Sequence, residues 1–179
     1  MDYEKNRVQL ISFFAALCMF LSAIEYAIPK PLPFLRLGLA NLPVLLSLFV
    51  LRRRDTIILI FLKVLAQGFI SGTIFSYIFV FSAAGSFASG FIMLAAHALL
   101  WKTKHISAIG LCLAGAIANN LAQIGVAFLI IFGQNTRFIA PVLLASGLVT
   151  GLLLGFFANT FMQKSKWFAS LTANETEVA

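Results

Sequence analysis

The chain has 179 residues, of which 61% are hydrophobic and only 11% are charged, and its mean hydropathy is +0.98. This composition excludes an ordinary water-soluble domain, so we expect the lipid bilayer to be the solvent and one transmembrane domain to cover residues 1–170. The net charge of +7 comes from short runs of Lys and Arg between apolar segments, which is the pattern of topology signals and not of nucleic-acid binding.

The apolar segments predict an all-α membrane protein with six transmembrane helices. The first apolar segment is expected to be a retained helix and not a signal peptide. The tract from Thr56 to Trp101 is too long for one crossing, and the small-residue stretches 71–73 and 82–86 both remain candidates for the turn within it. The expected helices cover residues 8–28, 37–51, 56–78, 82–101, 106–132 and 138–162, followed by a flexible cytoplasmic tail over 171–179.

The stretch Pro29–Pro43 contains four prolines between the first and second apolar segments. Proline fixes φ and lacks an N–H, so this stretch cannot be a regular helix. Irregular backbone at membrane depth survives only where protein buries it or where it lines a wet cavity. We therefore predict a stiff extracytoplasmic loop that covers a site, then a short helix that begins near Leu37 and is recessed or broken at Pro43. A plain surface loop is the alternative.

The distribution of cations predicts the orientation of the chain. One predicted side of the membrane carries nine cations and the other carries three, so the positive-inside rule places both termini in the cytoplasm. The cytoplasmic set is Lys5, Arg7, Arg52, Arg53, Arg54, Lys102, Lys104, Lys164 and Lys166, and the outer set is Lys30, Arg36 and Arg137.

Few polar side chains fall within the apolar segments, and each such group needs a partner or a function because it is costly in a membrane. Arg36 stands where the second helix begins, so it would favour an anionic ligand. Helical spacing puts Lys63 and Gln67 on one face. The alternative is interhelical hydrogen bonding worth about 0.6 kcal/mol per bond. The candidate residues of an outward-opening binding cavity are Glu25, Arg36, Asn41, Lys63, Gln67, Asn119, Asn120 and Gln123.

No catalytic, metal or cofactor site is predicted. His97 has no second histidine or acid at metal-ligand spacing, and Cys18 and Cys112 are expected to be small core residues. The sequence has neither an aspartate-rich DDxxD pair, which would hold Mg²⁺ for diphosphate chemistry, nor a phosphate-binding loop for ATP hydrolysis. A binding protein is therefore favoured over an enzyme.

Small residues at helical spacing predict faces where another helix approaches closely. The last predicted crossing carries Gly147, Gly151 and Gly155, and the first carries Ala16. Packing within the monomer and docking of a partner membrane protein are both consistent with this spacing.

Four stretches resemble a known family. A Glu followed by Ile-Pro near the end of the first helix, the block Arg36–Asn41 (RLGLAN) and the stretches 63–76 and 115–123 look like the bacterial Gx transporter family, which is often labelled heptaprenyl diphosphate synthase component I. That family often carries His-Asn where this chain has Asn119-Asn120, so the resemblance does not extend to a proton or metal role there.

The resemblance implies a shape similar to the substrate-binding S-components of energy-coupling-factor transporters. It implies a multi-pass protein of the bacterial inner membrane that takes up a small molecule with a transmembrane T-component and ATPase subunits. The family label implies an alternative, which is a non-catalytic membrane component associated with heptaprenyl diphosphate or quinone synthesis or with flavin and quinone electron transfer.

Overall fold

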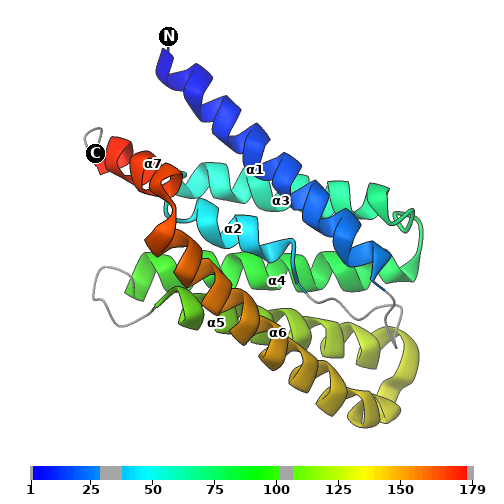
Figure 1. Ribbon diagram of the computed structural model, residues 1–179. Coiled ribbons are helices and arrows are strands. Elements are labelled where there is room, and N and C mark those ends of the chain that lie inside the picture. The colour runs from blue at the N-terminus through cyan, green and yellow to red at the C-terminus, as the bar shows by residue number, and fades with distance from the viewer. Residues whose placement is uncertain (1, 29–37, 101–106, 177–179) are drawn as a thin grey trace.

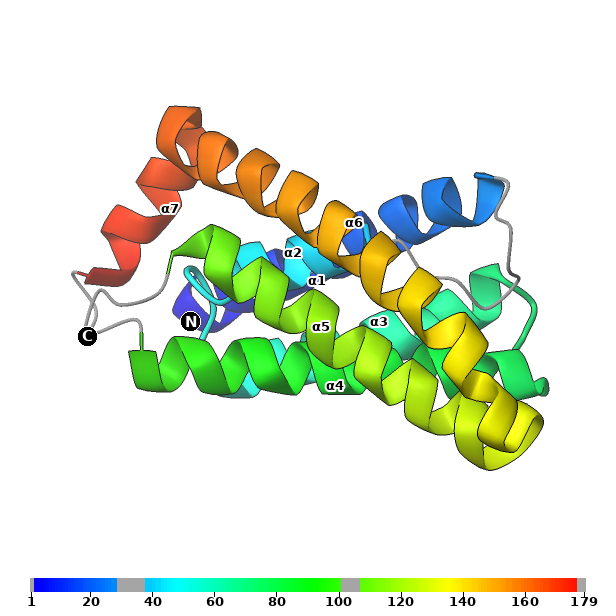
Figure 2. The same ribbon diagram turned by 90° about the horizontal axis from the view of Figure 1, so that it is seen from below.

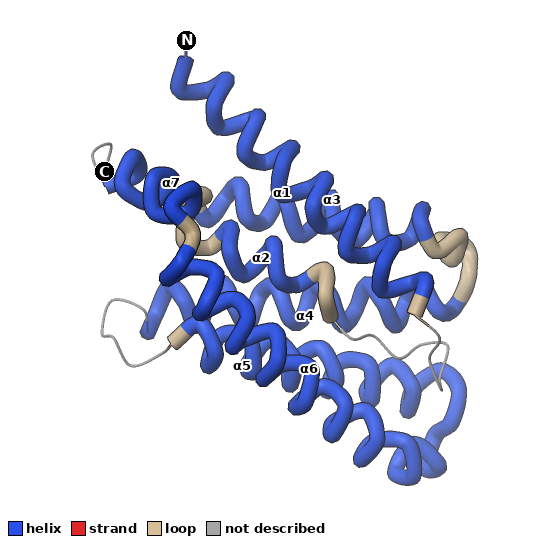
Figure 3. The backbone as a smooth tube through the Cα atoms, viewed as in Figure 1, coloured by secondary structure: helices blue, strands red, loops and turns tan. Residues whose placement is uncertain are grey.

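The computed structural model describes residues 2–28, 38–100 and 107–176, and every regular element within these ranges is helical (Figure 3). The all-α prediction is therefore confirmed for this part of the chain. The elements are α1 (Asp2–Ala27), α2 (Asn41–Ser47), α3 (Arg53–Ile70), α4 (Tyr77–Leu100), α5 (Ala108–Ala127), a π-helical turn η1 (Phe128–Phe132), a 3₁₀ turn η2 (Gly133–Asn135), α6 (Thr136–Lys164) and α7 (Lys166–Thr176).

The long helices wrap around the short helix α2. The pairs α1–α3, α3–α4, α4–α5 and α5–α6 pack against each other, and α2 contacts all five of these helices. Figure 1 shows α2 in the middle of the bundle, and Figure 2 shows the same arrangement from below. Every residue of α2 is buried, so this helix forms the centre of the core.

The second helix differs from its prediction because it has only seven residues, which span about 10 Å and cannot cross a membrane. It begins at Asn41, while the predicted start near Leu37 lies outside the described residues. Pro43 does not break it, because Pro43 is its third residue, where a helix makes no intrahelical N–H bond. Gly38 precedes α2 with φ of +81°, a left-handed conformation that favours glycine.

The turn between α3 and α4 lies at residues 71–76, so the predicted helices 56–78 and 82–101 were wrong at this boundary. Gly72 supplies the positive φ of +63° that the turn requires. The competing stretch 82–86 lies inside α4, where Ser82, Gly85 and Ser86 are buried. Its small residues mark a close helix contact and not a turn.

The turn before α6 follows the sequence more closely. Gly133, with φ of +49°, reverses the chain between η1 and α6, near the predicted turn at 133–137. The predicted tail from 171 is helical as far as Thr176, where α7 ends, and its flexibility stays a prediction. An aromatic contact holds the start of α7 against α1, since the ring centroids of Trp167 and Phe13 lie 5.3 Å apart.

Within the described residues, three continuous helical stretches are long and apolar enough to cross a membrane: Arg7–Ala27, Tyr77–Leu100 and Ala108–Lys164. The third contains both α5 and α6. The outer surface carries large exposed apolar side chains such as Phe69, at 73% exposed, and Leu129, at 80%, which suggests a membrane protein. The 18-residue helix α3 is excluded from this set because Arg53, Arg54, Asp55 and Lys63 interrupt it.

Both termini lie at one end of the bundle (Figure 1). At this end the Arg7 guanidinium is paired with the Asp55 carboxylate, which is only 1% exposed, and this ion pair ties α1 to the first turn of α3. Cys18 and Cys112 are buried and unbridged, as expected of small core residues.

The glycine face of α6 packs inside the monomer and does not form the predicted docking surface. Gly147, Gly151 and Gly155 are buried against α5. A Cβ added at Gly151 would lie 2.8 Å from the Ala116 Cβ, and one at Gly155 would lie 2.9 Å from the Ile109 Cα. Ala16 is exposed on α1, so its docking role remains a proposal.

Gly151→Leu should destabilise the bundle itself, because the added side chain meets α5 at van der Waals overlap. We expect a loss of about 1–3 kcal/mol in the free energy of unfolding, read as a lower melting temperature in detergent. The matched control is Gly125→Leu, since an added Cβ there meets nothing within 4 Å. Equal melting temperatures for the two variants would contradict close α5–α6 packing.

Candidate functional site

The structure places the predicted binding residues in the interior of the bundle. Seven of the eight lie in the described ranges, and all seven are between 0% and 9% exposed. The eighth, Arg36, lies outside the described residues. The seven are Glu25 on α1, Asn41 on α2, Lys63 and Gln67 on α3, and Asn119, Asn120 and Gln123 on α5.

Two charged side chains hold the segment that leads into α2. The Lys63 ammonium donates a hydrogen bond to the Asn41 side-chain oxygen at the start of α2. The Glu25 carboxylate accepts a hydrogen bond from the Leu39 backbone N–H at 2.9 Å. Both groups are almost fully buried, at 3% and 0% exposed, so each needs such bonds to remain inside an apolar bundle. Together they fix where α2 begins.

A second set of polar groups links α3, α4 and α5. The Ser86 hydroxyl donates to the Gln67 side-chain oxygen at 3.3 Å. Asn119 lies against Gly85, where an added Cβ would overlap the Asn119 side-chain oxygen, so the absence of a side chain on α4 makes room for this amide. The Asn119 amide donates to the Asn120 side-chain oxygen at 3.3 Å.

Asn120 continues the set to α6. Its amide donates to the Leu143 carbonyl, and an added Cβ at Gly147 would collide with the same amide. The two glycines, Gly85 and Gly147, therefore have one physical role. Each lets an asparagine of α5 reach a neighbouring helix.

Gln123 is the exception in this network. It is 0% exposed, and neither its Nε2 nor its Oε1 has a hydrogen-bond partner among the described residues. A buried amide without a partner costs about 1–3 kcal/mol, and such groups in native structures call for a water, an ion or a ligand. Gln123 therefore carries two buried polar atoms whose hydrogen-bonding capacity the described residues leave unused.

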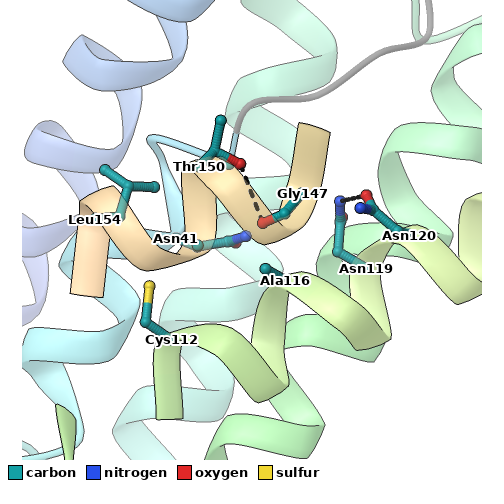
Figure 4. A pocket seen from close by; sticks show the side chains of 10 residues that line it. Asn41, Cys112, Ala116, Asn119, Asn120, Gly147, Thr150 and Leu154 are labelled. Atoms are coloured by element: carbon teal, nitrogen blue, oxygen red, sulfur yellow. Dashed lines mark hydrogen bonds between the residues drawn. The ribbon is translucent and has the colours of Figure 1, made fainter. Parts of the chain in front are cut away.

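A narrow crevice joins the two sets of polar groups (Figure 4). It is lined by Asn41 of α2, Asn119 and Asn120 of α5, and Gly147 and Thr150 of α6, together with apolar neighbours. As it stands, the crevice has room for about one water molecule, so a larger ligand requires its walls to separate.

The arrangement offers amide donors and acceptors with one charge of each sign, from Lys63 and Glu25. Within the described ranges, no group of three or more His, Cys, Asp or Glu side chains is placed to hold a metal ion. Groups of these kinds can form hydrogen bonds and ion pairs with a polar molecule.

Several contributors were not singled out in the sequence. Ser86 and Gly85 were noted only within one of two candidate turns, and Gly38 was noted only within the RLGLAN block. A Cβ added at Gly38 would lie 3.2 Å from the Asn41 amide nitrogen, so a glycine at this position leaves that side chain its room. Cys18 also contributes, since its thiol donates to the Ala40 carbonyl at 3.6 Å. In the sequence, the signal that could have identified Gly38 was its position three residues before Asn41, a polar residue in an apolar segment.

A comparison with protein families matched residues 14–161 to a family described as heptaprenyl diphosphate synthase component I. The match covers every residue of the polar network and carries the synthase label without any statement about transport. The comparison with curated proteins found no match, and neither did the comparison with solved structures.

The Lys63–Asn41 bond should appear as energetic coupling between α3 and α2. In a double-mutant cycle with Lys63→Met and Asn41→Leu, we expect a coupling energy of about 1.5–3 kcal/mol, typical of hydrogen bonds to charged groups. The measurement is the free energy of unfolding in detergent. A control cycle of Lys63→Met with Ser165→Ala, at the α6–α7 junction, should be additive. Additive effects in both cycles would show that the Lys63–Asn41 hydrogen bond does not contribute to stability.

Gln123→Met should stabilise the ligand-free protein, because it replaces a buried amide, which no described residue hydrogen-bonds, with an apolar side chain of similar volume. The expected gain is about 1–3 kcal/mol, measured as a higher melting temperature. A lower melting temperature would mean that Gln123 serves only to hold the helices together.

Proposed function

Since the chain belongs to the heptaprenyl diphosphate synthase component I family, we propose that it is the ligand-binding membrane subunit of a multi-subunit assembly. The family description names a component, which makes partner subunits a natural expectation. The polar network supplies the binding function. The observation that carries the proposal is Gln123, which is fully buried yet has no polar partner within the described residues.

The ligand that best suits these groups is small and polar, and an acidic group on it would meet the Lys63 ammonium. It would be taken up from the outer side of the membrane. The network supports this reading because its groups come from α2, α3, α5 and the end of α1, so one ligand could link four helices. In this proposal a transmembrane partner and ATPases supply the energy, as S-components of energy-coupling-factor transporters require.

The topology follows from the proposal and from the charges. Residues 1–170 form one transmembrane domain of a bacterial inner membrane, and the end of the bundle with both termini and Arg52–Arg54 faces the cytoplasm. The Gly72 and Gly133 turns then face outward.

The second candidate is a non-catalytic membrane component for heptaprenyl diphosphate synthesis, and the family description is the observation that favours it. The chain holds only two aspartates, Asp2 and Asp55, so the aspartate-rich pair that binds Mg²⁺ in diphosphate chemistry would have to come from a partner. In this case the chain would hold or deliver a prenyl compound at the membrane.

A thermal-shift screen of small polar metabolites tests the leading proposal. A ligand present at 100 times its dissociation constant stabilises the protein by about 2.7 kcal/mol, which gives a clear rise in melting temperature. We expect at least one compound to stabilise the wild-type protein and to stabilise Gln123→Met much less. A hit that stabilises both equally would bind elsewhere, and a screen in which polar anions, cations and neutral compounds all fail would contradict the proposal.

The assay for prenyl transfer separates the non-catalytic role from an enzyme. Purified alone with farnesyl diphosphate, isopentenyl diphosphate and Mg²⁺, the protein should form no longer prenyl chain. Its readout is product length by mass spectrometry, with a known prenyl synthase as positive control. Product formation that follows the purified chain through successive columns would overturn the non-catalytic assignment.

A further inference from the structure

A second cavity, separate from the polar network, lies at the end of the bundle that carries both termini. Its volume is about 350 Å³, within the usual range for ligand pockets. It forms where the segment after α2, the start of α3 and the last turns of α4 meet. Its lining residues are Leu48, Leu51, Arg52, Arg53, Thr56, Leu94, His97 and Ala98.

One part of this cavity is polar and basic. Arg52 and Arg53 are exposed at its rim, and Thr56 lies one turn further along α3. The guanidinium of arginine matches phosphate oxygens with paired hydrogen bonds, and the N-terminus of an 18-residue helix adds positive potential. The nearby acid, Asp55, does not offset these charges, because Arg7 already pairs with it.

The rest of the cavity is apolar. Leu48 and Leu51 are buried in its wall at 5% and 8% exposed, and Leu94 and Ala98 of α4 also line it. The ring of His97 packs edge-on against Phe49 at 5.1 Å, which fixes the end of α4 beside the segment after α2. The cavity therefore joins a cationic rim to a hydrocarbon wall.

We propose that this cavity binds the phosphate head and the first apolar carbons of a phosphate-headed amphiphile. Basic pockets between membrane helices at the cytoplasmic side are suited to such heads, and the positive-inside orientation places this one there. Two sources share this chemistry: a prenyl diphosphate and an anionic phospholipid. The site is distinct from the network around Gln123, and its test does not depend on the proposed function.

The test is binding of tritiated farnesyl diphosphate and, in a parallel arm, of radiolabelled phosphatidylglycerol to the full-length protein in a neutral detergent. Farnesol, which lacks the head, and inorganic diphosphate, which lacks the chain, should each compete at least 10-fold more weakly than the intact amphiphile. Tighter binding of phosphatidylglycerol would identify a membrane lipid as the occupant, and tighter binding of farnesyl diphosphate would identify a prenyl diphosphate; either supports the site.

Variants of lining residues, compared with variants of neighbours outside the cavity, test whether the ligand binds in the cavity. Arg53→Gln at the rim and Ala98→Trp, which fills the apolar wall, should each weaken binding at least 10-fold. Arg54→Gln and Ala95→Trp are the controls, because both residues are exposed neighbours that do not line the cavity, and binding should change less than 3-fold. The melting temperature of each variant verifies that it is folded. Because Arg53 is exposed, Arg53→Gln should fold normally, so it still tests the site if Ala98→Trp does not fold.

Three results would overturn the proposal. Equal effects of Arg53→Gln and Arg54→Gln would reduce the binding to general surface charge. Inorganic diphosphate competing as well as farnesyl diphosphate would show that the apolar wall contributes nothing. Failure of both labelled amphiphiles to bind would remove the site.

Discussion

The arrangement depends on how a buried ammonium group is accommodated in an apolar bundle. Lys63 is 3% exposed, and its bond to the Asn41 side-chain oxygen connects α3 to the first residue of α2. Glu25 holds the preceding backbone through the Leu39 N–H. These two bonds fix the position of a helix too short to be stable alone. The other helices then pack around α2, which buries its whole length and closes the core.

Composition and segment length predicted the helical class and most of the long helices, because an apolar helix that faces lipid must be long and nearly uncharged. The same rule predicted α2 to be a longer, membrane-spanning helix, which it is not. Its apolar residues are buried by protein instead of lipid, and hydropathy cannot distinguish these two environments. The boundary of α4 was misplaced for a related reason, since Gly85 and Ser86 serve a close helix contact although their residue types also suit a turn.

The residues of the polar network could be found from the sequence because each is costly in an apolar segment. Their connections could not. That Asn120 reaches α6 follows from Gly147, whose spacing in the sequence was consistent with both internal packing and a docking face. That Gln123 finds no hydrogen-bond partner in the described part of the chain emerges only when α4 and α5 are placed side by side. The basic cavity was missed for the same reason, because its walls come from three separate segments.

Native mass spectrometry of the gently extracted wild-type protein tests most directly whether the bundle interior holds a ligand. Our account predicts a bound small polar molecule that persists until the protein is denatured and whose occupancy falls when Asn119, beside Gln123 in the network, is replaced by leucine. A protein that carries only lipid and detergent, with the same spectrum for the Asn119→Leu variant, would contradict it. The polar network would then be a set of structural bonds and nothing more.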